Sequence, residues 1–414
     1  EAVKAVVGRC NKNLCLYYFF LNTHDGIADE HNAVNGLFKS VMMENSDIYA
    51  KTVSITDEKN QKKHLMEIVA KEIKAGCIEN EIQYEKGKRE VKKLYDVQIN
   101  KTFRCKFKKN GIYLITGGLG GLGSIISKYL CSQYKAKLIL CGRKEWNEEI
   151  AAQIREIQKD GGEAGYIKAD ISDALDVHRL VEEARKLYGK INGVIHAAAV
   201  IHDVVIKEKQ ADEFEKIIAP KVLGTYYLDQ ELATEKLDFF ILFSSMSSVL
   251  GNAGQSDYCY GNRFMDCFAE TRSRLVKRGS RKGKTIVINW SFWKEGGMKL
   301  DELQTRWMER QFGLVLMDNS RGLAVLEDCL KADSTQVVVF NGDQNKIRDV
   351  LGIPKPEEEQ AAEEREEELP EPDKSEFDSG FEELETMLDK EEMEEINSLS
   401  EDELIELLKK ETNS

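Results

Sequence analysis

The feature that most constrains the fold is a glycine-rich segment between a short apolar run and a helical pattern. The apolar run spans residues 112–115, and it is followed at once by Thr116-Gly117-Gly118-Leu119-Gly120-Gly121-Leu122-Gly123. Helical periodicity continues through Leu130, and a second apolar run covers Leu138–Leu140. Strand, glycine turn, helix and strand in this order predict a βαβ unit. The amides of such a turn and the N-terminus of its helix can hold a pyrophosphate.

The same alternation of apolar runs and helical patterns continues to about residue 353. The further strand candidates are Gly165–Ala169, Gly193–His196, Asp238–Phe243, Thr285–Asn289 and Val337–Phe340. Strands that alternate with helices predict a doubly wound parallel sheet. We therefore expect an α/β fold in which residues 110–353 form one complete dinucleotide-binding domain.

Residues 1–109 have the pattern of a smaller, truncated copy of this architecture. The candidate strands are Leu14–Phe20, Tyr49–Ile55, Glu81–Tyr84 and Val91–Val97, and the candidate helices lie near Asn32–Met43 and Lys59–Lys74. This segment contains no glycine-rich phosphate turn. We expect a structural subdomain, a truncated Rossmann half that binds no nucleotide.

The charge of the chain is concentrated in its last 60 residues. These carry 25 acidic and 6 basic side chains, whereas the whole chain has a net charge of −14, so residues 1–354 are mildly basic. The composition predicts an acidic linker over 354–378 and a short helical docking element over 379–414, in which Ser400 and Glu403 form a capping box. The basic charge of the body is too weak to indicate nucleic-acid binding.

The cysteines and the apolar runs exclude several other classes of protein. Nine scattered cysteines without a Cys-x-x-Cys pair indicate neither a disulfide framework nor a metal site, and they fit reduced thiols in a cytoplasmic protein. The apolar runs have the length of strands, which indicates no membrane span, and the first residues contain no signal peptide.

Four polar residues in the second half form a catalytic pattern with the glycine turn. Tyr258 is followed four residues later by Asn262, with Ser245 and Lys221 upstream. A tyrosine can give a proton to a carbonyl oxygen if a nearby cation lowers its pKa from the usual ~10. Lys221 would be that cation, Ser245 would orient the ketone, and Asn262 would fix Lys221 or a relay water. With hydride from a nicotinamide, the pattern predicts ketone reduction.

The ends of the predicted strands indicate which cofactor is bound. An NAD-selective site would have Asp or Glu after the second strand, whereas this chain has Arg143 and Lys144, which suit the 2′-phosphate of NADPH. Asp170 and Ile171 follow the third strand, where a carboxylate can accept a hydrogen bond from adenine. The small residues after His196, Ala197 and Ala198, let the cofactor approach the backbone, and we assign His196 itself no catalytic role.

At these residues the chain resembles the short-chain dehydrogenase/reductase superfamily and, within it, the ketoreductase domains of modular polyketide synthases. Such domains have Tyr-x-x-x-Asn with the lysine on an earlier helix. The matching segments are Ala219-Pro220-Lys221-Val222, residues 238–245 and residues 251–258, and the resemblance covers residues 1–353. It implies an NADPH-dependent reductase acting on a β-ketoacyl chain, which an acyl carrier protein holds through phosphopantetheine. It also implies other synthase domains or docking elements as partners of the C-terminal helices.

The resemblance extends to stereochemistry and to the type of synthase. Many B-type domains have Leu-Asp-Asp where this chain has Ile201-His202-Asp203, and A-type domains tend to have Trp where it has Leu250. Both positions imply B-type reduction to a D-configured (3R) hydroxyl. The segment from Asn289 to Met298, which includes Trp293, looks like versions from synthases fed by a separate acyltransferase. We therefore group Asp203, Leu250, Trp293 and Met298 as substrate and stereocontrol residues.

Two other interpretations remain open from the sequence. One is a stand-alone short-chain reductase that acts on free acyl-CoA or on a small ketone; the N-terminal half and the tail argue against it. The other is a catalytically silent scaffold whose tail docks other proteins; the intact set of Tyr258, Ser245, Lys221 and Asn262 argues against it. Oxidation of NADPH in the presence of a β-ketoacyl thioester would separate the three.

Overall fold

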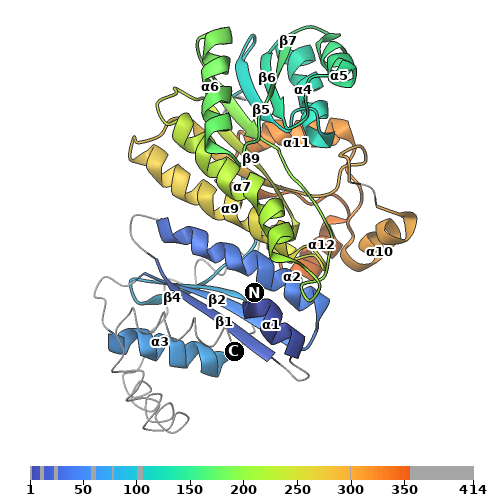
Figure 1. Cartoon of the computed structure of the whole chain (residues 1–414). Helices are drawn as coiled ribbons and strands as arrows, with labels where there is room; N and C mark the ends of the chain where they lie inside the picture. Colours follow the sequence, from blue (N-terminus) through green and yellow to red (C-terminus); the bar gives the residue numbers. More distant parts are fainter. Residues whose placement is uncertain are drawn as a thin grey trace.

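The chain forms a smaller N-terminal and a larger C-terminal α/β half, drawn in blue at the bottom and in green to orange above (Figure 1). The computed structural model describes residues 2–9, 14–22, 27–56, 62–76, 79–99, 106–298 and 300–354. The expected linker and docking helix, from residue 355 onward, lie outside the described residues.

The larger half contains the doubly wound parallel sheet that the sequence predicts. Its strand order is β11-β10-β9-β8-β5-β6-β7, and all neighbouring strands are parallel. The strands are β5 (Ile112–Thr116), β6 (Lys137–Gly142), β7 (Glu163–Lys168), β8 (Gly193–His196), β9 (Phe239–Ser245), β10 (Lys284–Trp290) and β11 (Gln336–Val338). The order reverses between β5 and β8, which is where ligands bind in open α/β sheets.

Helices cover both faces of this sheet and bury its alternating side chains. On one face, Tyr113 and Ile115 of β5 belong to a core that includes residues of α4 (Gly121–Tyr134), α5 (Glu148–Gln158) and α11 (Asn319–Cys329). On the other, Ile112 and Leu114 pack with α6 (Ala174–Tyr188), α7 (Ala211–Glu231) and α9 (Ser256–Lys277). The remaining helices of this half are α8 (Ser247–Leu250), α10 (Glu302–Phe312) and α12 (Gln344–Leu351). Burial on both faces explains why the strands are continuously apolar.

The N-terminal half is a four-stranded sheet in the order β1-β2-β3-β4. Strands β1 (Leu14–Leu21), β2 (Ile48–Thr56) and β3 (Glu81–Glu85) are parallel, as the sequence predicts, and β4 (Lys88–Val91) is antiparallel to β3. Helices α2 (Val34–Glu44) and α3 (Lys62–Ala75) cover opposite faces of this sheet (Figure 1). A 3-10 turn, η1 (Ile27–Ala33), precedes α2, and helix α1 (Ala2–Arg9), which the sequence analysis does not anticipate, packs beside it.

The predicted strand Val91–Val97 is wrong. The strand ends at Val91, and residues 92–98 have no regular structure. The chain turns instead at Lys86-Gly87, where both residues have positive φ (52° and 78°). Two such residues make the tight turn that favours a β-hairpin, so the chain pairs back onto β3 immediately.

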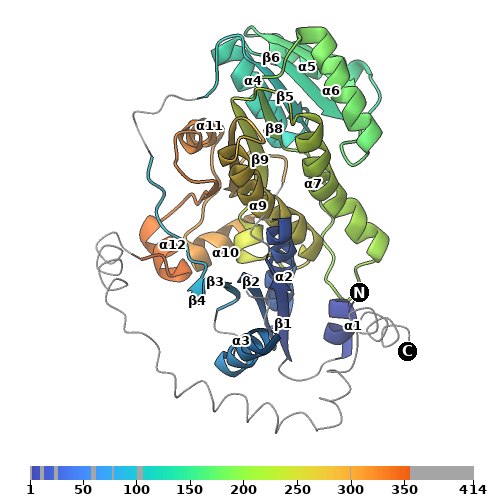
Figure 2. The ribbon, with the colours of Figure 1, turned by 90° about the vertical axis from the view of Figure 1, so that its left-hand side faces the viewer.

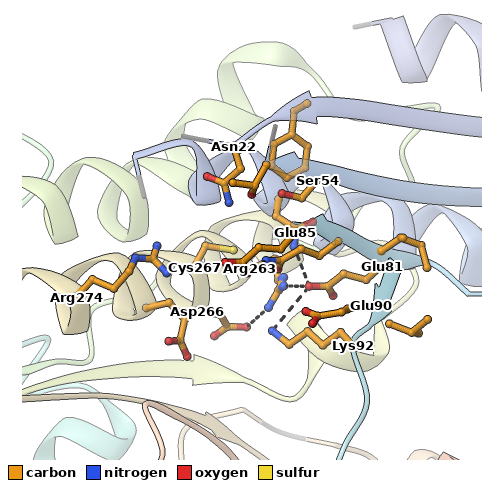
Figure 3. Close-up of a pocket in the computed structure, with 17 residues that line it drawn as sticks. Asn22, Ser54, Glu81, Glu85, Glu90, Lys92, Arg263, Asp266, Cys267 and Arg274 are labelled. Carbon is orange, nitrogen blue, oxygen red and sulfur yellow. Dashed lines mark hydrogen bonds and ion pairs between the residues drawn. The ribbon is translucent and has the colours of Figure 1, made fainter. Parts of the chain in front are cut away.

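The two halves meet along α2 and α9, which lie side by side (Figure 2). Their interface contains a buried ion network, in which Glu81 of β3 pairs with Arg263 of α9 (Figure 3). Lys39 and Lys92 also lie near the Glu81 carboxylate, with N–O distances of 3.8 and 3.7 Å. Although burial by itself raises the pKa of Glu81, these cations outweigh it and lower the pKa to about 2. The network therefore ties the two halves together at neutral pH.

Candidate active site

The glycine turn brings bare backbone to the carboxyl edge of the larger sheet. It follows β5, and α4 begins within it at Gly121. Gly117 has a φ of +64°, and a Cβ added to Gly121 would lie 2.1 Å from the carbonyl oxygen of Gly296. No side chain fits at Gly121, because the segment after β10 passes directly against the turn. The amides of Gly117 and Gly120 already donate to the carbonyls of Cys141 and Gly117, so it is the N-terminus of α4 that the turn offers to an anionic group.

A cavity with a volume of about 460 Å³ lies beside this turn. It is lined by five residues of the turn, Gly117, Gly120, Gly121, Leu122 and Gly123, and by Ala197, Lys221, Ser245 and Tyr258. Thr116 is buried behind the turn, and Gly118 and Leu119 are not part of the lining. The structure therefore brings the glycine turn together with three of the four predicted catalytic residues.

Ser245, Lys221 and Tyr258 come from three elements that converge on this cavity. Ser245 ends β9, Lys221 lies in the middle of α7, and Tyr258 lies in the first turn of α9. The Lys221 Nζ donates to the carbonyl oxygen of Phe243 at 3.1 Å and lies 5.3 Å from the centroid of the Tyr258 ring. The Ser245 Oγ accepts from the Ser247 amide at 3.2 Å. All three side chains are nearly buried, which gives them fixed positions.

Asn262 lies behind Tyr258, one helical turn further along α9. Its Nδ2 donates to the backbone carbonyl of Tyr258 at 2.9 Å, and the side chain is fully buried. Its Oδ1 is buried and accepts no hydrogen bond from the described residues. An unsatisfied buried carbonyl is costly, so this oxygen marks a place for a donor such as a water or an ammonium group.

Burial reverses the charge balance that the sequence predicts for the lysine and tyrosine. We expected Lys221 to lower the pKa of Tyr258; instead burial raises the pKa of Tyr258 to about 12, although hydrogen bonds with Asn262 and Ser245 act against it. Burial also lowers the pKa of Lys221 to about 7, opposed by the charge of Asp266. The expectation treated Lys221 as a fully charged group, but desolvation disfavours the charged form of both side chains.

His196, to which the sequence gave no catalytic role, connects the glycine turn to the lysine helix. Its Nε2 donates to the Pro220 carbonyl at 3.0 Å, and its Nδ1 accepts from the Thr116 hydroxyl at 2.6 Å. Burial and the neighbouring charge of Lys221 lower the pKa of His196 to about 3, so the ring is neutral and this tautomer is fixed by its partners. The ring thus positions Lys221 relative to β5. The only sequence signal for this role is its place as the last residue of the strand candidate Gly193–His196.

A second, smaller cavity of 140 Å³ lies on the other side of the glycine turn. Its lining includes the predicted cofactor residues Arg143, Asp170, Ile171 and Ala198. It shares Gly117 and Ala199 with the first cavity, so the two adjoin at the glycine turn.

The polar side chains in and beside this second cavity differ in whether they already form ion pairs or hydrogen bonds within the chain. Arg143 forms no ion pair within the described part of the chain, whereas the neighbouring Lys144 lies 3.7 Å from Glu149. One oxygen of Asp170 accepts from the Ser172 amide and hydroxyl. A glycine turn with an unpaired guanidinium and the partly buried carboxylate of Asp170 beside it fits an anionic dinucleotide.

The four predicted stereocontrol residues are not brought together. Trp293 and Met298 line the first cavity, but Trp293 is 3% exposed, and its ring packs against Gly322 and Trp290. Leu250 lines a different cavity, between α8, α12 and residues 92–97. Asp203 is exposed on the segment after β8 and accepts from the Gln255 side chain at 3.0 Å.

The described residues also bear on membrane spans and metal sites. No helix in the described ranges is both long and apolar enough to cross a bilayer. Among the same residues, no three His, Cys, Asp or Glu side chains are grouped as metal ligands would be.

Two family models match the chain. Residues 111–295 match the KR domain, and residues 3–72 match a model described as beta-ketoacyl synthase-like, N-terminal. Polyketide synthase PksN of Bacillus subtilis (strain 168) is 34% identical over 319 residues, which is 77% of this chain and 6% of PksN. Polyketide synthase PksM of the same organism is 40% identical over 279 residues, 67% of this chain and 6% of PksM. The chain thus spans about 6% of the length of these curated relatives.

Solved structures show the same similarity over most of the chain. A ketoreductase domain from the bacillaene assembly line is 32% identical with a TM-score of 0.78, covering 84% of this chain and 83% of that one. An N-terminal ketoreductase from the macrolactin assembly line is 34% identical with a TM-score of 0.72, covering 84% of this chain and 68% of that one. The similarity therefore includes both halves of the fold.

Proposed function

The chain belongs to the ketoreductase-domain family of polyketide synthases, and on that premise we propose that it reduces a β-ketoacyl thioester to the β-hydroxyacyl thioester with NADPH. The observation that carries the proposal is the first cavity, which Tyr258, Ser245 and Lys221 line together with the glycine turn. A proton donor, a hydrogen-bonding hydroxyl and a cofactor cradle are thus within reach of one small substrate group.

Tyr258 is the proposed proton donor. Because burial raises its pKa to about 12, the hydroxyl keeps its proton at neutral pH until the substrate oxygen develops negative charge. A bound reduced nicotinamide supplies the hydride that adds to the carbonyl carbon. The Tyr258 proton then goes to the carbonyl oxygen, so the C=O double bond becomes a C–H and an O–H bond. Ser245, whose hydroxyl lies on the same cavity wall, orients that oxygen by a hydrogen bond.

Lys221 and Asn262 support the proton transfer. With a pKa of about 7, Lys221 is partly charged at neutral pH, and its ammonium 5.3 Å from the Tyr258 ring stabilises the tyrosinate that forms when the proton leaves. Asn262 Oδ1 can accept a hydrogen bond from a water or from the Lys221 ammonium, and it would hold that donor in place while the donor returns a proton to Tyr258.

The second cavity supports the choice of NADPH. The unpaired Arg143 guanidinium would hold the 2′-phosphate, with Lys144 as a weaker second cation. Asp170 and Ile171 would line the adenine, and Ala197 and Ala198 would lie against the cofactor where β8 ends. Preference for NADPH thus rests on a free cation where an NAD site has a carboxylate.

We assign the substrate and its stereochemistry from the family. The β-ketoacyl chain would arrive as a phosphopantetheine thioester on an acyl carrier protein, and other synthase domains would flank this one. Residues Asp203 and Leu250, with their B-type identities, support a 3R hydroxyl product. Chiral analysis of the product from a β-ketoacyl thioester surrogate tests this assignment, and a 3S product would contradict it.

The variant Tyr258→Phe tests the reaction itself. We expect kcat/KM with a β-ketoacyl thioester surrogate to fall by ~10²–10⁴-fold, because the proton donor is removed, while NADPH affinity stays the same. The matched control is Tyr260→Phe, since Tyr260 lies two residues further on the same helix with its ring against Phe214. Full turnover by Tyr258→Phe, or an equal loss in Tyr260→Phe, would contradict the assignment.

A further inference from the structure

One face of α2, in the N-terminal half, contacts the segment that precedes Tyr258 in the sequence. Ser40 and Glu44 are four residues apart and therefore lie on the same side of this helix. The Ser40 hydroxyl donates to the Asn252 carbonyl at 2.6 Å, and Glu44 reaches the Gly254 amide two residues further on. The N-terminal half thus contacts backbone only a few residues before the proposed proton donor.

Glu44 binds two separate backbone segments with one carboxylate. Its Oε1 accepts from the Gly254 amide at 2.9 Å, and its Oε2 accepts from the Ile206 amide at 2.8 Å. Glu44 is also the last residue of α2, where a negative charge opposes the helix dipole. Its position is therefore unfavourable for the helix itself and is explained by these two charge-assisted hydrogen bonds.

The two segments that Glu44 binds flank the first cavity, and we call them the paired loops, residues 201–209 and 252–257. Ile201, at the start of one, lines the cavity, and the other ends directly before Tyr258. They are bonded to each other, since the Val204 amide donates to the Gly254 carbonyl at 2.9 Å.

A buried lysine, Lys209, forms hydrogen bonds within both of the paired loops. The Lys209 Nζ donates to Asp257 Oδ2 at 2.6 Å and to the carbonyls of His202 and Gly254 at 3.4 Å each. Glu44 is the matching group from the N-terminal half: it accepts from amides of the same two loops. Gly254 is therefore held at its amide by Glu44 and at its carbonyl by Val204 and Lys209.

We infer that Glu44 is a positioning residue, through which the N-terminal half holds the paired loops in the arrangement that orients the substrate in the cavity. The inference rests on the proposed ketone reduction at that cavity. Glu44 touches no reacting group; it acts through the wall that begins at Ile201 and through the turn before Tyr258. The wall decides how the acyl chain enters, and hence which face of the ketone is reduced.

The variant Glu44→Gln tests this role in the full chain. A glutamine has one acceptor oxygen, and its NH2 group would face a second backbone N–H, so one of the paired loops must be released. With a β-ketoacyl thioester surrogate we expect KM to rise about tenfold and the ratio of the two alcohol enantiomers to fall about tenfold. This is the size of effect expected from the loss of one charge-assisted hydrogen bond. NADPH affinity should not change, and kcat should change less than KM.

The matched control is Glu72→Gln. Glu72 is bound by Lys51, Tyr84 and Arg89, all within the N-terminal half, so this variant destabilises that half without touching the paired loops. We expect it to lower the melting temperature at least as much as Glu44→Gln, with KM and the enantiomer ratio unchanged. If Glu72→Gln shifts KM and the ratio equally, or if Glu44→Gln shifts neither, Glu44 has only a structural role.

Amide hydrogen exchange gives a readout that does not depend on activity. Glu44→Gln should accelerate exchange at Ile206 or Gly254 relative to the unchanged chain, while Glu72→Gln should not. If the parent protein reduces no β-ketoacyl surrogate but this acceleration is seen, the proposed function fails and the loop contact stands; if exchange does not change, the inference itself fails. Should Glu44→Gln not fold, Glu44→Asp, with both oxygens on a shorter side chain, serves for the same measurements.

Discussion

The N-terminal half borders a cavity where its sheet faces α9, and the larger half forms a cavity at its glycine turn; the two have similar volumes of 440 and 460 Å³. Their walls differ. The cavity of the N-terminal half is lined by charged side chains, which include Glu81, Glu85, Lys92 and Arg263 (Figure 3). The cavity of the larger half is lined by the glycine turn and by hydroxyl groups around a single lysine.

The difference indicates that the chemistry of the wall, and not the volume of the cavity, distinguishes the proposed cofactor site from an interface between the halves. In the N-terminal half, the charges pair with one another and with α9, as Glu81 does with Arg263. In the larger half, glycines line the cavity without side chains, and the cation directly after β6, Arg143, has no partner in the described structure. Groups that already satisfy each other hold the halves together, whereas unsatisfied groups are available to a ligand.

The largest expected effect concerns the interface. Glu81→Gln should lower the free energy of unfolding by about 3 kcal/mol, because it leaves the buried Arg263 with only the more distant Asp266 carboxylate, at 3.8 Å. Chemical denaturation measures this loss. The control Glu67→Gln, in an exposed pair with His64, should change stability by less than about 0.5 kcal/mol.

The same carboxylate gives the interface a pH dependence. Its pKa is lowered from 4.5 to about 2 in the folded chain, so its contribution to stability is present above pH 4.5 and is lost as the pH falls toward 2. Glu81→Gln should remove that part of the acid sensitivity. An unchanged acid transition in the variant would show that the network does not link the halves.

The second prediction concerns the glycine cradle. Gly121→Ala should weaken NADPH binding about 30-fold, or about 2 kcal/mol, since the new Cβ would collide with the Gly296 carbonyl. Gly165→Ala is the control, because a Cβ there meets nothing within 4 Å. Cofactor titration by fluorescence distinguishes them, and equal affinities would show that the cradle does not hold the cofactor.

A smaller effect is expected at the unpaired cation. Arg143→Ala should weaken NADPH about tenfold and leave NADH nearly unchanged, because only NADPH brings a 2′-phosphate to the guanidinium. Lys144→Ala should have a smaller effect, since Lys144 already lies near Glu149. Equal binding of NADPH and NADH by the parent protein would contradict this role of Arg143.

The smallest effect is a shift in the pH profile. Because the pKa of Lys221 is about 7, kcat/KM for NADPH should fall as the pH rises through about 7 and the lysine loses its charge. The lowered pKa makes the contribution of Lys221 to stability rise over the window from about 7 to 10.5, so this loss would not reflect unfolding. Asp266→Asn should move the fall to lower pH, since the Asp266 charge raises this pKa. A profile that does not respond to Asp266→Asn would exclude Lys221 as its cause.

Much of the fold follows from local patterns in the sequence. The alternation of strands and helices after residue 110 predicts the parallel sheet, which is confirmed. The glycine turn, which occurs only after residue 110, distinguishes the complete domain from the truncated one. The predicted strand Val91–Val97 was wrong because the turn at Lys86-Gly87 determines which residues pair with β3. This turn lies before the segment that was predicted to be a strand. Helix α1 has only 8 residues, which is too short to give a clear helical period.

What the sequence by itself determined are features set by neighbouring residues: the strand, turn and helix around Gly117, and the spacing that puts Tyr258 and Asn262 one turn apart. The tertiary structure decided which distant groups meet and how deeply they are buried. It placed Lys221 beside Tyr258 and reversed the expected pKa shift, and it put Glu44 of the other half against the loops of the cavity. Backbone geometry and periodicity are local, whereas desolvation and contacts between segments arise only when the whole chain packs.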